Sequence, residues 1–185
     1  DLPLIIPINL AIFCGENKTI EKTVVLKTKK QEFIFRNVKS HLQIPLVTYF
    51  REFSSPVEWE SDTTLDENFL ILKNEKDFFT LYNIVKEFYK KIILSRLDGK
   101  PDPKIENKLI STLTSFIKNK DINLSLLSEL LSIPTFAEIE SEMENIDPLK
   151  IYKTIDELNH LFGTKLKKEL YFKLQEIEKN LDKVW

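Results

Sequence analysis

Glycine, histidine and cysteine are all scarce in this 185-residue chain, and each shortage excludes a class of site. With only three glycines, the chain can form neither a GxGxxG fingerprint nor another phosphate-cradling loop. The single cysteine, Cys14, excludes an internal disulfide and leaves a cysteine-based zinc site short of ligands. The two histidines, His41 and His160, lie outside any HExxH motif, so a zinc site would need the fold to join both with a carboxylate. We interpret His41 instead as a partly exposed strand-edge residue and His160 as a helix-surface residue.

Long apolar runs and an excess of one charge are also missing. No uninterrupted apolar run approaches the roughly 20 residues that a membrane-spanning helix needs. The net charge of −2 at pH 7 argues against a basic face for nucleic acid. We therefore expect no membrane partner and no nucleic-acid partner. The single cysteine and the lack of a signal sequence in view permit a cytoplasmic location, which we expect. The apolar fraction of 42% is adequate for a folded core.

The first 60 residues have the pattern of β-structure. The segment from Pro3 to Phe13 is apolar with interspersed prolines, which is typical of an extended chain. A hairpin-type turn is expected at 15–18, and runs of β-branched and aromatic residues predict strands at 23–26, 32–35 and 46–52. Short strands separated by turns favour a small antiparallel, Ig-like β-sandwich over residues 1–60. A sandwich of this size should depend on neighbouring structure for part of its core.

After Trp59 the apolar residues recur at helical spacing. Thr64-Leu65-Asp66-Glu67 matches a capping box, and Asp-Pro pairs at 102–103 and 147–148 supply an N-cap followed by proline at the first helical position. Helices are predicted to start at 64, 77, 102, 124, 136 and 147, with a further one after a break at Gly163-Thr164. Residues 61–185 are therefore expected to form an all-α, irregular helical-repeat superhelix, with a compact bundle as the alternative.

Few side chains in the chain point to chemistry. The aromatic stripe Phe78/Tyr82/Tyr89 is interpreted as packing rather than a cofactor box, and the basic cluster at 165–168 as a solvated helix face rather than a patch for an acidic partner. Residues 54–55 are serines without a G-x-S-x-G elbow, so an independent serine hydrolase has almost no support. We predict no catalytic, cofactor-binding or metal-binding residue in this segment.

The two ends of the sequence favour a piece cut from a longer polypeptide. The chain begins at Asp1 directly on an apolar segment and ends at Trp185 after a helical pattern without a stop signal. Natural termini are more often polar and frayed. We therefore expect further domains outside residues 1–185.

One motif and several flanking patches carry a family resemblance. Residues 50–57 (FREFSSPV) resemble the [EDR]FSAPV-like motif that ends the small β-sandwich domain of the aminopeptidase N family of zinc metallopeptidases, in its bacterial and apicomplexan branch. Further patches resemble that family in the same order: IIPINL at 5–10, QEFIFRNV at 31–38, IPLV at 44–47, DF at 77–78, LLSIPT at 130–135 and IDPL at 146–149. Two departures are Ser55 in place of alanine, and FTLY after Asp77-Phe78 where the family has Ser-Arg-Trp-Asp/Glu.

The resemblance implies that residues 1–60 form the β-sandwich linker domain and residues 61–185 the first half of the C-terminal helical superhelix, truncated at its C-terminus. Members of the family remove N-terminal amino acids from peptides. Their zinc is held by HExxH and a downstream glutamate, and a GAMEN segment holds the substrate amine. Neither HExxH nor GAMEN is present here, so no catalytic residue is carried over.

The expected role of this segment is therefore steric and not catalytic. It would cap and shape the active-site chamber of a parent enzyme. Its partner would be the upstream catalytic domain of the same polypeptide, which would hold the zinc, and peptide substrates would bind to the parent enzyme. The segment alone should be inactive. The alternative is a stand-alone helical-repeat scaffold that binds protein segments.

Overall fold

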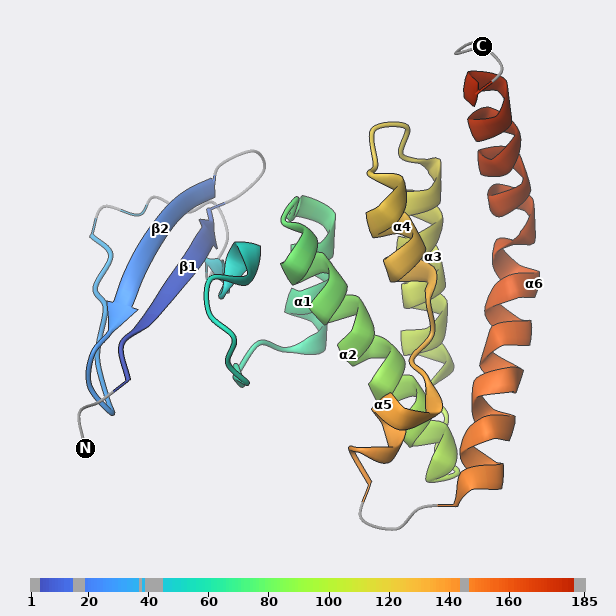
Figure 1. Ribbon diagram of the computed structural model, residues 1–185, viewed down its shortest axis with the longest axis horizontal. Helices are drawn as coiled ribbons and strands as arrows, with labels where there is room; N and C mark the ends of the chain where they lie inside the picture. The colour runs from blue at the N-terminus through green and yellow to red at the C-terminus, as the bar shows by residue number, and fades with distance from the viewer. Residues whose placement is uncertain (1–3, 15–18, 37, 39–44, 144–146, 182–185) are drawn as a thin grey trace. The chain divides into compact units, whose positions relative to one another are not determined.

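The computed structural model describes residues 4–14, 19–36, 38, 45–143 and 147–181, with side chains up to residue 179. The chain divides into two compact units, residues 1–84 and residues 85–185, and the division falls within helix α2. Figure 1 shows the elements of both units along the chain. Each unit is described by itself.

Unit 1 contains a three-stranded antiparallel sheet in the order β2-β1-β3. Strand β1 (Ile6–Phe13) pairs along its whole length with β2 (Thr19–Leu26), and its C-terminal end pairs with the short β3 (Leu46–Thr48) (Figure 1). The predicted strands at 3–13 and 23–26 are confirmed at β1 and β2, whereas the predicted turn at 15–18 lies outside the described residues.

Two of the strand predictions were wrong in whole or in part. Residues 32–35 form no strand. Just before them the Gln31 side chain folds back on the end of β2, where its Nε2 donates to the Val25 carbonyl at 3.2 Å and its Oε1 accepts from the Lys27 amide at 2.9 Å, and Phe35 then packs on the sheet face without strand pairing. The strand expected over 46–52 ends at Thr48. The backbone turns left-handed at Phe50 and continues as a 3-10 turn, η1 (Arg51–Phe53).

The sheet buries both of its faces. Alternate side chains of β1 point to opposite faces, so Ala11 and Phe13 pack with Leu46 and with Ile71 of helix α1 (Leu65–Asn74), and partly buried Ile84 lies against them. On the other face the buried residues are Leu10, Ile12 and Cys14, packed against Val24, Phe35, Val47, Tyr49 and their neighbours. One face of the sheet therefore depends on helical residues for its core, as expected for so small a β-structure.

The helices begin where the capping signals predict. Thr64 forms a reciprocal capping box with Glu67 at the start of α1, and Asp77 accepts hydrogen bonds from the amide and hydroxyl of Thr80 before α2 (Phe78–Leu97). Gly99, with φ of +73°, follows the end of α2. The remaining helices are α3 (Pro103–Lys118), α4 (Leu124–Leu131), α5 (Phe136–Glu140) and α6 (Pro148–Leu181).

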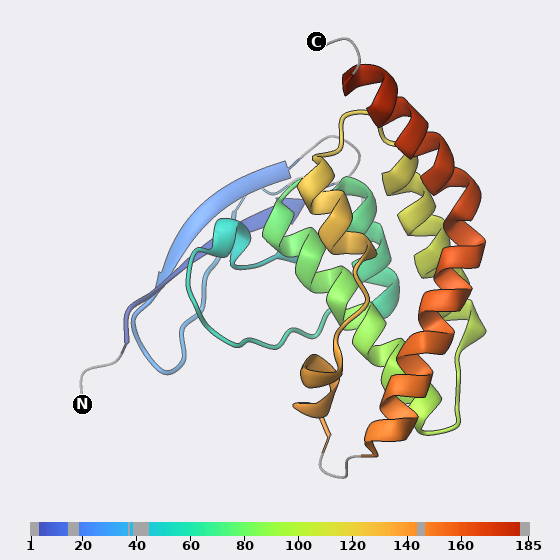
Figure 2. The ribbon, with the colours of Figure 1, turned by 45° about the vertical axis from the view of Figure 1, so that its right-hand side comes forward.

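In unit 2, α6 packs along α3 and contacts α5 (Figure 2). The core of unit 2 contains a buried stripe on each of these two long helices and further buried residues of α2: Leu109, Leu113 and Ile117 of α3, Ile151, Leu158, Phe162 and Leu166 of α6, and Val85, Phe88, Tyr89, Ile92 and Ile93 of α2.

Three lysines add polar links between the helices of unit 2. The ammonium groups of Lys150, Lys173 and Lys86 donate to the carbonyls of Leu97, Asn119 and Ser132, at the C-terminal ends of α2, α3 and α4 respectively. A cation at a helix C-terminus satisfies an otherwise free carbonyl and interacts favourably with the helix dipole.

The predicted helix break at Gly163-Thr164 was wrong, since α6 runs through this position without interruption. Leu158, Phe162 and Leu166 are buried at four-residue spacing on both sides of Gly163, so the packing of one continuous stripe outweighs the low helix propensity of glycine. Gly163 is exposed, and a Cβ placed there would meet nothing within 4 Å.

Replacing Gly163 by alanine should therefore stabilise the protein. Alanine in a helix interior is favoured over glycine by about 0.5–1 kcal/mol, and here it meets no steric obstacle. We expect Gly163→Ala to raise the free energy of unfolding by about that amount, measured by urea denaturation followed by circular dichroism at 222 nm.

The matched control is Gly99→Ala. Gly99 also has free space around it, but its positive φ strains any residue with a Cβ. This variant should lose about 1 kcal/mol. A Gly163→Ala protein that is less stable than the parent chain would contradict a regular α6 at this position.

Candidate functional site around Arg51 and Glu75

Glu75, in the link between α1 and α2, carries a carboxylate that is almost fully buried, with a side chain only 1% exposed. Its Oε1 accepts hydrogen bonds from Arg51 Nη2 at 3.0 Å and from the backbone amides of Lys76 at 2.7 Å and Asp77 at 2.8 Å. Its Oε2 accepts from the Thr48 hydroxyl at 3.0 Å. Burying a carboxylate is costly unless donors and an opposite charge replace water, and here both are present.

Arg51 joins this buried carboxylate to an exposed one. Its Nη1 lies 2.6 Å from Glu21 Oε1, on a side chain that is 67% exposed, while its Nη2 pairs with Glu75. Burial lowers the pKa of Arg51, but the hydrogen bonds and negative charges of Glu21 and Glu75 outweigh burial and raise the pKa above its ordinary value. Arg51 is therefore cationic throughout the physiological pH range.

The backbone beside Arg51 is held in an unfavourable conformation. Phe50, Glu52 and Phe53 have φ values of 56°, 55° and 52°, in the left-handed region that costs a non-glycine residue on the order of 1 kcal/mol or more. The Glu52 amide donates to Asp77 Oδ1 at 3.0 Å, and the Phe53 ring packs edge-on against Phe79 at 5.1 Å. These contacts, together with the Arg51–Glu75 pair, hold the turn in place.

The two serines that follow the turn bind it to β1. Ser54 Oγ accepts from the Asn9 amide at 3.0 Å, and the Ser55 hydroxyl donates to the Pro7 carbonyl at 2.6 Å. Both hydroxyls thus form hydrogen bonds with the backbone of β1, so their role in the structure is to fix the turn to the strand. The segment that carries the family motif is tied to the sheet by Ser54 and Ser55 and to the α1–α2 link by Arg51 and Glu52.

Other residues considered from sequence have separate places. His160 is exposed on α6, and His41 lies outside the described residues. Tyr89 is fully buried, its ring lies 5.5 Å from that of Phe162, and its hydroxyl donates to the Leu130 carbonyl at 3.3 Å. Burial raises the pKa of Tyr89, so its hydroxyl stays protonated and can donate.

The rest of the aromatic stripe and the basic cluster are more exposed. Phe78 is 44% exposed and Tyr82 is half-buried, so the stripe packs fully only at its Tyr89 end. In the cluster at 165–168 the three lysines are exposed and Leu166 is buried, as expected of a solvated helix face.

Within the described ranges, no group of three or more His, Cys, Asp or Glu side chains is arranged to hold a metal ion. No helix in that part of the chain combines the length and apolarity required to cross a membrane. The expectation that residues 1–185 contain no catalytic, cofactor-binding or metal-binding residue stays a prediction.

Comparison with protein families assigns both parts of the chain to known families. Residues 65–183 match the family described as a domain of unknown function (DUF3458_C) with ARM repeats, and residues 1–62 match the domain of unknown function (DUF3458) with an Ig-like fold. The chain belongs to the DUF3458_C family, since that match covers well over half of it. The expected fold class, an Ig-like β-domain followed by a helical-repeat region, is confirmed. The boundary between residues 60 and 61 stays a prediction.

Individual relatives agree with this assignment. Aminopeptidase N of Escherichia coli is 22% identical over 180 residues, which are 91% of this chain and 20% of the relative. Aminopeptidase N of Caulobacter vibrioides is 22% identical over 114 residues, 62% of this chain and 13% of that relative. The crystal structure of Legionella pneumophila aminopeptidase A in complex with aspartic acid has a similar fold, with a TM-score of 0.76 at 19% identity over 94% of this chain and 20% of its own.

The chain thus spans about a fifth or less of the length of these relatives. It corresponds to the C-terminal domains of an aminopeptidase N-like protein, as the resemblance of residues 50–57 predicts.

Sequence reasoning identified the segment at 50–57 but missed its partners Thr48, Glu75 and Glu21. Glu75 had no local signal, because its burial depends on Thr48 and Arg51, which lie 27 and 24 residues away. Glu21 and Thr48 had none, because their proximity to Arg51 depends on strand pairing.

Removing the charge of Glu75 should destabilise unit 1 strongly. Glu75→Gln leaves Arg51 without its buried counterion, and breaking a buried pair in this way costs about 3–5 kcal/mol. Urea unfolding measures this cost, followed by the fluorescence of Trp59, whose ring packs 5.6 Å from those of Tyr49 and Phe50. A Trp185→Phe background makes Trp59 the sole tryptophan.

The matched control removes the other partner of the same arginine. Glu21 is exposed, so Glu21→Gln should cost about 1 kcal/mol or less. If the two variants lost equal stability, the buried Arg51–Glu75 pair would not have the role assigned to it.

Proposed function

We propose that this chain is the non-catalytic part of a zinc-dependent aminopeptidase, whose remaining part removes N-terminal amino acids from peptides. The observation that carries the proposal is the match to Escherichia coli aminopeptidase N over 91% of this chain, together with the two family matches. HExxH and GAMEN motifs do not occur in the sequence, so zinc and the catalytic residues are assigned to the part of the parent outside residues 1–185. The cytoplasm is the proposed compartment.

The role proposed for unit 2 is to shape and cap the active-site chamber. Such a cap acts by steric exclusion of water and of folded proteins, which requires a stiff wall. Two features of unit 2 support stiffness: the buried stripes that join α3 to α6, and the lysines that bind the C-terminal ends of α2, α3 and α4. Unit 1 would serve as the linker, with the Arg51–Glu75 pair fixing its sheet to its helices.

The assignment of catalysis to the part of the parent outside residues 1–185 is tested with the complete reading frame that encodes this segment. The full-length protein should hydrolyse a fluorogenic alanyl or leucyl amide, and a chelator should abolish that turnover until zinc is restored. The chain of residues 1–185 should show no turnover under the same conditions. A full-length protein without HExxH and without turnover would favour the scaffold alternative, and chelator-sensitive turnover by the isolated chain would refute the proposal.

The capping role is tested in the same full-length protein with Lys173→Met. Lys173 is buried and donates to the Asn119 carbonyl at 2.9 Å, so its loss loosens the α3–α6 contact, costing about 1–3 kcal/mol in an unsatisfied carbonyl. Turnover of a long peptide relative to a single-residue amide should change, because only the long peptide is sensitive to chamber shape.

Lys165→Met, at an exposed position on the same helix, is the control and should leave the ratio unchanged. Equal ratios in the Lys173 variant, the control and the parent protein would contradict a role of unit 2 in capping.

A further inference from the structure

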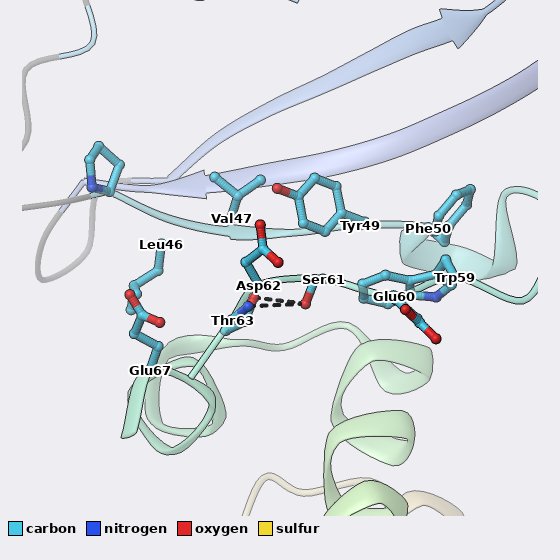
Figure 3. A pocket seen from close by; sticks show the side chains of 11 residues that line it. Leu46, Val47, Tyr49, Phe50, Trp59, Glu60, Ser61, Asp62, Thr63 and Glu67 are labelled. Carbon is cyan, nitrogen blue, oxygen red and sulfur yellow. Dashed lines mark hydrogen bonds between the residues drawn. The ribbon is translucent and has the colours of Figure 1, made fainter. Parts of the chain in front are cut away.

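An open pocket of about 710 Å³ lies in unit 1, between β3 and the segment that leads to α1 (Figure 3). Aromatic side chains form one wall: the Trp59 ring packs 5.6 Å from both Tyr49 and Phe50, and Trp59 is 39% exposed. Val47 of β3 extends the apolar surface. The pocket is therefore a concave surface on which the Trp59 ring is accessible to solvent.

The polar groups of the pocket are acidic. Three of its lining residues carry carboxylates, namely Glu60, Asp62 and Glu67, and none of the 11 lining residues that the structure describes is Lys, Arg or His. Figure 3 shows the Asp62 carboxylate and the Tyr49 hydroxyl pointing into the same space. Burial and the nearby charge of Asp62 together raise the pKa of Tyr49, so its hydroxyl stays neutral and available as a donor or acceptor.

Glu67 is held in its charged form at neutral pH. Hydrogen bonds from the Thr64 side chain and the Thr64 amide lower the pKa of Glu67 below its usual value. The Glu67 carboxylate is therefore already engaged by Thr64, whereas Glu60 and Asp62 are exposed residues, and the Asp62 carboxylate faces the pocket beside Tyr49 (Figure 3). An exposed aromatic ring beside exposed carboxylates is complementary to an organic cation and unfavourable for an anion.

We propose that this pocket is a binding site for a basic peptide, which inserts an arginine side chain. A guanidinium can stack on the face of Trp59 while its N–H groups donate to Asp62, and its alkyl stem fits against Val47. Lysine has the charge but not the planar group, so it should bind more weakly. This site is independent of the peptidase activity proposed for the parent, since it needs neither zinc nor catalytic residues.

The binding test uses the 185-residue chain carrying Trp185→Phe, so that Trp59 is the only tryptophan. The probe is acetyl-Gly-Arg-Gly-amide, and its neutral match is the same peptide with citrulline, which replaces the guanidinium by a urea of equal shape. The arginine peptide should change Trp59 fluorescence in a saturable way, and the citrulline peptide should bind about tenfold more weakly. Raising the salt concentration should weaken the arginine peptide further.

A charge variant locates the site. Asp62→Asn should weaken arginine-peptide binding about threefold to fivefold, as expected of a partly exposed ion pair. Glu129→Gln is the matched control, an exposed carboxylate on α4 in unit 2, and should bind like the parent chain. Circular dichroism checks that both variants are folded.

Three results would overturn the proposal: no saturable fluorescence change, equal binding of arginine and citrulline peptides, or equal affinity in the Asp62 and Glu129 variants. None of these results depends on the turnover of the full-length protein, so the binding site and the proposed function are tested independently.

Discussion

Unit 1 depends on one buried interaction, the pairing of Glu75 with Arg51. A carboxylate this deep is stable only because a guanidinium, a hydroxyl and two backbone amides replace its water. The same pairing holds a turn whose backbone is left-handed at several non-glycine residues. Arg51 lies three residues after the end of the short β3, while Glu75 lies in the link between α1 and α2, so the pair connects the sheet to the helices that complete its core.

Unit 2 is built on a different physical basis. Its helices are joined by long apolar stripes, and their C-terminal carbonyls are bound by lysine ammonium groups from neighbouring elements. Both devices restrict sliding of one helix along another, which suits a wall better than a moving part. A stiff helical unit and a small sheet fixed by an ion pair are consistent with a shaping role within a larger enzyme.

Local chemistry made much of the fold predictable. The capping residues Thr64, Asp77 and Asp102 predicted helix starts correctly, because the side chain that satisfies the first amides is adjacent in sequence. The failures depended on contacts that the local pattern does not contain. Gly163 lies inside α6 because packing of one continuous apolar stripe outweighs propensity, and Phe35 in the segment 32–35 packs on the sheet face beside Leu10 and Ile12 without strand pairing. The partners of Arg51 and the pocket at Trp59 depend on contacts between distant residues, so no sequence pattern revealed them.

Amide hydrogen exchange tests the central claim most directly, by NMR on the unaltered chain. The amides of Lys76 and Asp77 donate to Glu75, and the amide of Glu52 donates to Asp77. If the buried carboxylate holds this junction, all three should exchange as slowly as the paired amides of β1, since they open only when unit 1 unfolds. Exchange at free-peptide rates while β1 stays protected would show that the junction opens on its own, and the account of unit 1 would be wrong.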